Sequence, residues 1–221
     1  EWCLELDIST VTLYTFSTEN FNRPAAERAS LFDLITEKLY EFADADRIHD
    51  NAVCIRGLGA IDRLPPRLQD AVAYAEAQTN AYDQLRLNIA LAYGGRHELL
   101  QAARRVTASV AAGEQAVEAI TTDTVEAALY RESLPDVDLL IRTGGNRRTS
   151  NFLPWHAVGA RSAVYFTDAY WPDFSRRAFL QALHTYATRK QSFRRRQQER
   201  VTATAAWLRR QTPRDTPANT D

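Results

Sequence analysis

Short apolar segments rich in β-branched and aromatic residues alternate along this chain with longer segments that carry apolar residues at helical spacing. This alternation is typical of βαβ units, in which parallel strands are joined by helices that cover the sheet. We therefore predict an α/β fold, a single domain with a mostly parallel central sheet and helices on both faces. The predicted domain spans residues 1–210, and the polar stretch 211–221, with two prolines, is predicted to be a disordered tail.

The predicted elements follow from the period of the apolar residues. Strands are predicted over Val11–Phe16, Ala52–Gly57, Leu85–Ala92, Val137–Ile141 and Ala163–Thr167. Helices are predicted after Pro24, from Pro65 to about Asn80, from His97 to about Ala112, more weakly over Thr122–Leu129, and from Ser175 to Arg200 or on to Arg210. The first helix repeats Leu31, Leu34, Ile35, Leu39 and Phe42 on one face, and the second repeats Leu68, Ala71, Val72 and Ala75. The face of the first helix fits packing against a hydrophobic core.

Composition places the chain among folded proteins of a reducing compartment. Hydrophobic residues make up 45% and charged residues 25%, and no run approaches the roughly 18 apolar residues needed to cross a bilayer. The only cysteines, Cys3 and Cys54, are expected to be buried free thiols. We expect a cytoplasmic location. The chain starts at Glu1 and contains no methionine, so we expect that a segment precedes it.

The net charge of −1 conceals a basic end, because nine basic and three acidic residues lie from Arg189 onward. A solvated helix face is one interpretation. Another is contact with an anionic membrane surface through a basic C-terminal helix, with apolar anchors at Phe193, Val201, Trp207 and Leu208. Nucleic-acid binding is disfavoured, since the rest of the chain is acidic and no recognition motif accompanies the basic end.

Three predicted strands end in residues suited to a phosphate-bearing ligand. These ends run from Ser17 to Pro24, from Tyr93 to Arg96 and from Arg142 to Phe152. Glycines let main-chain N–H groups approach an anion, hydroxyls donate hydrogen bonds, and arginines bind phosphate oxygens in pairs. Each end alone also fits a helix cap, a turn or a surface arginine pair. Their common place at the carboxyl ends of parallel strands favours a ligand site.

Four blocks then resemble the signature of the cis-prenyltransferases, the family that includes undecaprenyl diphosphate synthase. They are TLYTFSTENFNRP (12–24), LNIALAYGGR (87–96), DLLIRTGGNRRTSNFLPWH (138–156) and YFTDAYWPDF (165–174), and the LPWH string is similar to archaeal members. The resemblance implies an enzyme that adds isopentenyl diphosphate units to an allylic diphosphate with cis double bonds, making a polyprenyl diphosphate. It also implies a homodimer and Mg²⁺ as cofactor.

The resemblance also assigns roles to residues. Asn20 stands where the family has a proton acceptor or hydrogen-bond partner near the condensing substrate, with Ser17, Thr18 and Glu19 as contacts beside it. Phe21 would form an apolar or stacking wall, and Arg23 would reach a diphosphate. Arg142, Arg148, Thr149 and Ser150 would bind isopentenyl diphosphate, helped by the main chain of Gly144 and Gly145.

Three positions depart from the family pattern. The Asp-Gly-Asn segment with the metal-binding aspartate would precede Glu1, and the metal-ligand glutamate is replaced by Arg161, which cannot ligate Mg²⁺. The Arg-x-Gly usual near the C-terminus is not seen around Ser192–Arg196. No metal ligand is therefore predicted within this chain.

These departures leave a second hypothesis open, a non-catalytic partner subunit of a heteromeric cis-prenyltransferase. Arg161 favours that hypothesis, whereas the intact Arg142–Ser150 block favours the enzyme, because a scaffold needs no phosphate-binding residues. Other enzyme classes lack their motifs. The four histidines have no ligand spacing, no Gly-x-Ser-x-Gly occurs, and the Gly57-Leu58-Gly59 string does not continue as a dinucleotide-binding loop.

Overall fold

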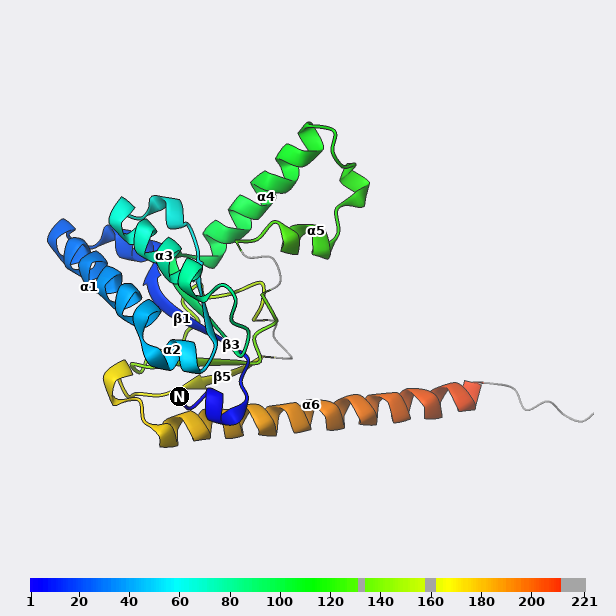
Figure 1. The fold of residues 1–221 in the computed structure, drawn as a ribbon. Helices are drawn as coiled ribbons and strands as arrows, with labels where there is room; N and C mark the ends of the chain where they lie inside the picture. Colours follow the sequence, from blue (N-terminus) through cyan, green and yellow to red (C-terminus); the bar gives the residue numbers. More distant parts are fainter. Residues whose placement is uncertain (131–133, 158–161, 212–221) are drawn as a thin grey trace, which may run out of the picture. The chain divides into compact units, whose positions relative to one another are not determined.

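The computed structural model describes residues 1–130, 134–157 and 162–211 (Figure 1). The chain forms two compact units. Unit 1 contains Glu1–Asp136 and Thr149–His156, and unit 2 contains Val137–Arg148 and Ala157–Asp221. The bounds predicted for the domain (1–210) and the tail (211–221) stay predictions, and residues 212–221 of that tail lie outside the described residues.

Unit 1 contains a three-stranded parallel sheet. Its strands β1 (Thr10–Ser17), β2 (Val53–Leu58) and β3 (Leu85–Tyr93) lie in the order β1-β3-β2. The central strand β3 is buried from Asn88 to Tyr93, as expected of an almost wholly apolar run with a strand on each side. The buried side-chain amide of Asn88 has a hydrogen-bond partner, because its Nδ2 donates to Thr12 Oγ1 on β1 at 3.2 Å.

Five α-helices of unit 1 are described: α1 (Ala25–Asp44), α2 (Asp46–Asp50), α3 (Pro66–Thr79), α4 (Gly95–Ala111) and α5 (Thr122–Ala127). Short 3-10 turns are η1 (Leu4–Leu6), η2 (Thr18–Asn22), η3 (Ile61–Arg63) and η4 (Val117–Ala119). Prolines start two of the helices as predicted, since Pro24 precedes α1 and Pro66 is the first residue of α3. The one-turn helix α2 and the 3-10 turns carry too few residues to show an apolar period, so the sequence did not predict them.

The core of unit 1 lies between the sheet and the packed pair α1 and α3. On α3 the predicted face is confirmed, because Leu68, Ala71, Val72 and Ala75 are all buried. On α1 the prediction is wrong at Leu34, which is 51% exposed. The packed face is centred on Ile35 and Leu39, so Leu34 lies on its outer edge.

Unit 2 pairs two short parallel strands with a long helix. The strands are β4 (Leu139–Arg142) and β5 (Ala163–Phe166), followed by the 3-10 turn η5 (Trp171–Asp173) and by α6 (Arg176–Gln211), which has 36 residues. Phe179 and Ala182 of α6 are buried, and Tyr186 donates from its hydroxyl to Asp138 Oδ1 at 2.9 Å. These contacts hold the first three turns of α6 against the strands.

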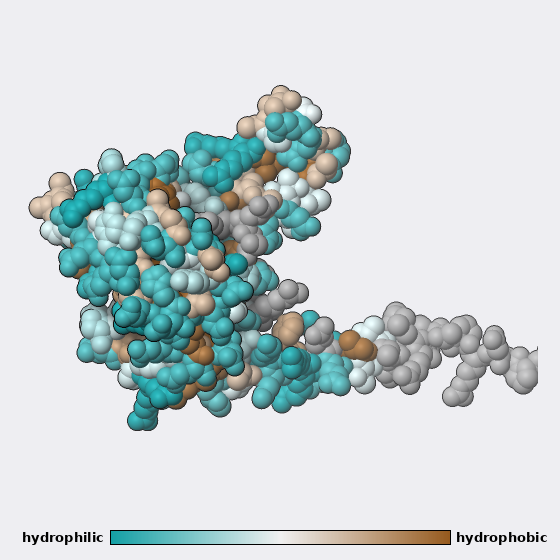
Figure 2. Space-filling view, in the orientation of Figure 1, coloured by the Kyte–Doolittle hydropathy of each residue, from teal (hydrophilic) through white to brown (hydrophobic). Residues whose placement is uncertain are grey.

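Beyond Tyr186, the described side chains of α6 are exposed except for the half-buried Ser192. Figure 2 shows this part of the helix as a largely hydrophilic surface. The helix takes the longer of the two predicted lengths. Of the helices that the structure describes, none combines the length and apolarity needed to cross a bilayer.

The predicted fold class is confirmed, because all five predicted strands occur and every pairing among the described strands is parallel. The carboxyl ends of β1 and β3 therefore lie at the same edge of the sheet of unit 1, where ligands of parallel α/β sheets bind.

Candidate functional site

The ladder between β1 and β3 is irregular where the two strands end. Tyr14 pairs with Ala90, Phe16 with Leu91 and Ser17 with Tyr93, so that each strand carries one residue without a partner. The unpaired residue of β3 is Ala92, which is fully buried at a φ of 46°. A bulge redirects the side chains that follow it, and left-handed non-glycine residues concentrate at functional sites.

The η2 turn follows β1 and contains Asn20. The Oδ1 atom of Asn20 accepts the main-chain N–H of Ser17 at 2.8 Å, and the Ser17 side chain accepts the N–H of residue 20 in return. Among the described residues, none bonds the Nδ2 of Asn20. The carboxamide therefore presents its donor group, which suits a hydrogen bond to a phosphate oxygen better than proton abstraction.

Glu19 is held by neighbours on both of its carboxylate oxygens. Thr18 Oγ1 donates to Oε2 at 3.1 Å, and Asn151 Nδ2 donates to Oε1 at 3.2 Å. Desolvation raises the pKa of Glu19, but hydrogen bonds from its own N–H, Asn151, Ser17 and Thr18 outweigh it, so the pKa lies below its ordinary value. The carboxylate is thus a fixed negative charge beside Asn20.

The glycine pair at the start of α4 serves close packing. A Cβ on Gly94 would lie 2.3 Å from Thr18 Oγ1, and one on Gly95 would lie 2.0 Å from Pro154 Cδ. The N–H groups of Gly95 and Arg96 donate to the main-chain and side-chain oxygens of Asn151, both at 2.8 Å. Of the two interpretations weighed for this strand end, the structure therefore favours the turn over the phosphate cradle.

The segment 149–153 carries two predicted substrate ligands, Thr149 and Ser150, in a strained conformation. Ser150, Asn151 and Leu153 have φ angles of 51°, 61° and 47°, and each such residue costs about 1 kcal/mol or more unless its surroundings compensate. Aromatic packing stabilises the segment. The ring of Phe152 stacks on Tyr14 with the ring centroids 4.4 Å apart, and it meets Tyr93 edge-on at a centroid distance of 5.8 Å.

The other side of the η2 turn is lined by arginines. The guanidinium of Arg63 lies 4.6 Å from the ring centroid of Phe21, which meets the buried Phe16 edge-on. Arg23 is paired with Glu27 one helical turn later, so it must exchange that partner to reach a diphosphate. Arg28 donates to the carbonyl oxygens of Phe21 and Arg23 at 2.8 and 3.0 Å and thereby fixes the end of the turn.

Unit 2 contains the other predicted ligands of isopentenyl diphosphate. The Nε atom of Arg142, the last residue of β4, is buried and has no hydrogen-bond partner among the described residues. Gly144 and Gly145 have φ angles of 80° and 72° that favour glycine. Their N–H groups donate to the oxygens of Ala169 and Thr167 at 2.8 and 3.1 Å, so these glycines shape the turn after Arg142.

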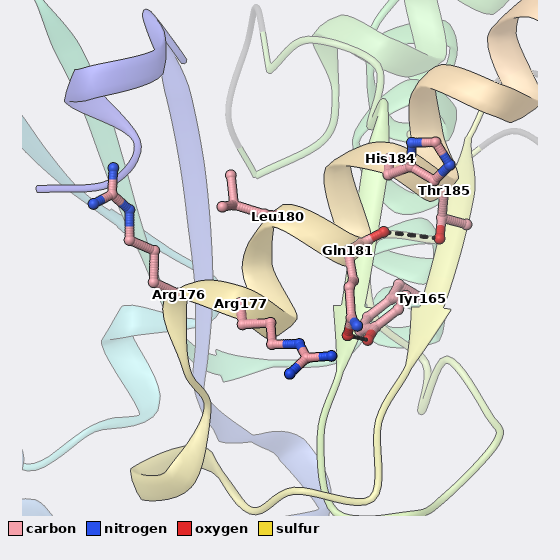
Figure 3. Close-up of a pocket in the computed structure, with 7 residues that line it drawn as sticks. All are labelled: Tyr165, Arg176, Arg177, Leu180, Gln181, His184 and Thr185. Carbon is pink, nitrogen blue, oxygen red and sulfur yellow. Dashed lines mark hydrogen bonds between the residues drawn. The ribbon is translucent and has the colours of Figure 1, made fainter.

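Two hollows are described. The larger, of about 730 Å³, lies in unit 2 between β5 and the first turns of α6 (Figure 3). It is lined by Tyr165, Arg176, Arg177, Leu180, Gln181, His184 and Thr185, none of which is a predicted site residue. The smaller, of about 280 Å³, lies in unit 1 beside α1 and the start of α3, and Phe32 and Leu68 are among its lining residues.

A magnesium site does not form from the described residues. No group of three or more His, Cys, Asp or Glu side chains among residues 1–130, 134–157 and 162–211 could hold a metal ion. Arg161, which the resemblance places at the position of the family's metal-ligand glutamate, lies outside the described residues.

In unit 1 the structure brings together three predicted groups of residues: Ser17–Phe21, the Gly94-Gly95 pair, and Thr149 with Ser150. The predicted residues Arg142, Gly144, Gly145 and Arg148 belong to unit 2. Sequence reasoning missed three residues, Asn151, Arg28 and Arg63, that organise the unit 1 site. Asn151 stood within a quoted block and Asn is common in left-handed positions, whereas nothing local in the sequence marked the two arginines.

Curated relatives are similar in sequence to this chain over most of its length. The prenyltransferase family model described as undecaprenyl diphosphate synthase matches residues 1–194. The tritrans,polycis-undecaprenyl-diphosphate synthase (geranylgeranyl-diphosphate specific) of Haloarcula marismortui is 54% identical over 202 residues, covering 91% of this chain and 66% of that protein. The protein of that name from Methanopyrus kandleri is 41% identical, with coverages of 88% and 71%. The chain thus spans about two thirds of the length of these relatives.

Solved structures agree with the sequence relatives. Lavandulyl diphosphate synthase from Lavandula x intermedia, in complex with dimethylallyl diphosphate, matches with a TM-score of 0.77 and 33% identity, covering 82% of this chain and 77% of that one. A probable undecaprenyl diphosphate synthase from Campylobacter jejuni matches with a TM-score of 0.72 and 30% identity, over 84% and 83% of the two chains. This chain belongs to the undecaprenyl diphosphate synthase family of cis-prenyltransferases.

Proposed function

We propose that this chain carries the substrate-binding machinery of a cis-prenyltransferase, which adds isopentenyl diphosphate to an allylic diphosphate and makes a polyprenyl diphosphate. The observation that carries the proposal is the hydrogen-bonded convergence of the η2 turn, the start of α4 and the segment 149–153 at the carboxyl ends of β1 and β3. The family membership supplies the reaction, and the donors at this edge suit its anionic substrates.

The reaction requires the C–O bond of the allylic diphosphate to break while the new carbon–carbon bond forms. Negative charge grows on the leaving diphosphate, and fixed donors that meet it lower the barrier. The Nδ2 of Asn20 is one such donor, and the Thr149 and Ser150 hydroxyls and the Arg142 guanidinium are proposed for isopentenyl diphosphate. An amide is a poor base, so we expect the leaving diphosphate or a water to take the proton from the isopentenyl unit.

The growing hydrocarbon needs an apolar path. The hollow beside α1 and α3 has Ala29, Phe32, Pro65 and Leu68 in its lining, and it lies next to the buried core cluster of unit 1. We propose that the prenyl chain leaves the diphosphate site along this helix pair, with the ion pair of Arg67 and Asp33 (3.4 Å) at its rim.

The names of the relatives support a proposal for the allylic primer. The curated relatives from Haloarcula marismortui and Methanopyrus kandleri carry a name that specifies geranylgeranyl diphosphate. We propose the same primer for the protein that contains this chain. Dimethylallyl diphosphate, the ligand in the plant structure, is the control primer, and it should support slower elongation.

The experiment is incorporation of radiolabelled isopentenyl diphosphate by the full-length protein, with each primer and with or without Mg²⁺. Primer-dependent incorporation by the protein alone supports the proposal, and its loss without Mg²⁺ supports the cofactor expected from the family. Incorporation that appears only after a paralogue is added would instead establish a non-catalytic partner subunit. A sedimentation measurement on the same sample tests the homodimer.

Cytoplasmic location and peripheral membrane contact are further proposals. The exposed part of α6 carries Arg194, Arg195, Arg196 and Arg200 with exposed apolar side chains at Phe193 and Val201, a pattern that anionic lipid surfaces attract. The proposed anchors Trp207 and Leu208 have side chains outside the described set. Cosedimentation with phosphatidylglycerol vesicles, but not with phosphatidylcholine vesicles, supports membrane contact, and equal recovery with both contradicts it.

A further inference from the structure

Asn151 is hydrogen-bonded at the same time to the start of α4 and to the η2 turn. It is not among the predicted substrate ligands. Its main-chain oxygen accepts the N–H of Gly95 and its Oδ1 accepts the N–H of Arg96, both at 2.8 Å. Its Nδ2 donates to Glu19 Oε1 at 3.2 Å. One residue thus joins the segment 149–153 both to the first turn of α4 and to the η2 turn.

These bonds stabilise a conformation that the segment would otherwise avoid. Ser150 and Leu153 adopt left-handed φ angles that serine and leucine rarely tolerate, and Asn151 between them has a φ of 61°. Asparagine accepts this region better than most residues do, and its bonds also satisfy two N–H groups that the start of a helix leaves free. Asn151 therefore suits this position in two ways, because it tolerates the left-handed backbone and it bonds the first N–H groups of α4.

From this geometry we infer that Asn151 is the positioning residue that fixes the Ser150 and Thr149 hydroxyls relative to the Asn20 turn. The inference rests on the proposed prenyl transfer. Since both side-chain polar atoms of Asn151 are bonded to protein, it acts through its neighbours. Its bond to Glu19, one residue from Asn20, sets the spacing between the groups proposed to bind the two diphosphates.

The test exchanges the donor and the acceptor of this bond. In Asn151→Asp the oxygen facing Arg96 remains, but two carboxylates face each other where Nδ2 met Glu19. In the double variant Asn151→Asp with Glu19→Gln, the Gln amide donates to the Asp carboxylate, so the bond and the total charge are restored. Asn151→Gly keeps the left-handed backbone and removes only the side-chain bonds. Asn80→Asp, an exposed asparagine of unit 1 at the end of α3, is the matched control.

Steady-state kinetics and melting curves of the full-length protein are measured for all variants. We expect Asn151→Asp and Asn151→Gly each to raise KM for isopentenyl diphosphate about tenfold or more, the effect of losing one hydrogen bond to a charged group. Glu19→Gln is also measured alone, because Glu19 is itself a predicted substrate contact. In the Glu19→Gln background, the Asn151→Asp exchange should change KM by no more than about threefold. Asn80→Asp should match wild type.

The outcomes separate the inference from the function it rests on. If wild type turns over and Asn151→Asp keeps its KM, or if Asn151→Asp raises KM as much in the Glu19→Gln background as in wild type, the positioning role is refuted while prenyl transfer stands. A fall in melting temperature with unchanged KM identifies a purely structural residue and also refutes it. Failure of wild type to incorporate isopentenyl diphosphate overturns the proposed function, and the inference falls with it.

Discussion

The ring of Pro154 lies against the main chain of Gly95 so closely that a Cβ on Gly95 would fall 2.0 Å from Pro154 Cδ. The same glycine donates its N–H to the carbonyl of Asn151 at 2.8 Å. The segment 149–156 and the start of α4 therefore approach each other through backbone and a rigid ring. Neither group can shift without a cost in free energy, so this contact fixes the position of Thr149 and Ser150 relative to the carboxyl ends of β1 and β3.

Replacing Gly95 by alanine should destabilise unit 1 and weaken substrate binding together. Overpacking of a rigid contact costs about 1–3 kcal/mol of unfolding free energy, and relief of the clash would displace the substrate loop. Chemical denaturation and the KM for isopentenyl diphosphate check both effects. Gly113→Asn is the control, because a Cβ there meets nothing within 4 Å and asparagine tolerates its φ of +75°. Wild-type stability of Gly95→Ala would disprove the packing role.

A buried carboxyl at the first turn of α4 should give unit 1 a pH-dependent stability. Glu98 is 1% exposed, accepts from the Tyr93 hydroxyl, and accepts the N–H of Tyr130 at 3.3 Å. Desolvation raises the pKa of Glu98 above its ordinary value of 4.5, although both hydrogen bonds lower it. The folded state therefore binds this proton more tightly than the unfolded state. The contribution of Glu98 to stability is complete below about pH 4.5 and is lost as the pH rises through the folded pKa.

To test the role of Glu98, the free energy of unfolding of Glu98→Gln is compared with that of wild type between pH 4 and about pH 8. This is the range in which a buried Glu titrates. The difference between their free energies of unfolding should shift in favour of Gln as the pH rises, because Gln carries no charge to desolvate. Glu118→Gln, on the exposed turn η4, should follow wild type throughout. A difference that is constant with pH would show that Glu98 does not titrate in this range.

Strand and helix positions were predictable because each is encoded by a local period. The run Leu85–Tyr93 is apolar almost throughout and forms the central strand, and the face of α3 from Leu68 to Ala75 is buried as its spacing predicts. Leu34 was misplaced because the apolar face of α1 is wider than the part of it that α3 covers. Which side of a wide face packs is a tertiary property.

The candidate site was predictable only as a set of strand ends. The Ser17–Asn20 turn and the Thr149-Ser150 pair carried recognisable chemistry, and the parallel pairing of β1 and β3 placed the ends of those two strands at one edge. The bonds that join the loops were not predictable. Asn151 meets Arg96 across 55 positions and Glu19 across 132, and no local pattern encodes such distant partners.

The η2 turn should depend on Arg28, an arginine that is not among the proposed substrate ligands. Arg28 reaches from α1 to the carbonyl oxygens of Phe21 and Arg23, where the turn ends with free acceptors. Arg28→Met keeps the aliphatic stem and removes the donors, so it should cost about 1.5–3 kcal/mol of unfolding free energy, the value of a charged hydrogen bond. Denaturant titration measures the loss. Arg104→Met, an exposed arginine of α4, should change stability little, and equal effects of the two variants would refute the capping role.

Arg142 is the strongest candidate for a direct ligand of isopentenyl diphosphate, because its Nε is buried without a hydrogen-bond partner among the described residues. A buried donor without a partner is costly, and a diphosphate oxygen would satisfy it. Arg142→Ala should weaken binding of isopentenyl diphosphate by about 1.5–3 kcal/mol, measured by titration calorimetry. Arg142→Lys keeps the charge but lacks the Nε donor, so it should recover only part of that loss. Arg147→Ala, exposed in the same turn, should bind like wild type. Unchanged affinity in Arg142→Ala would remove this residue from the site.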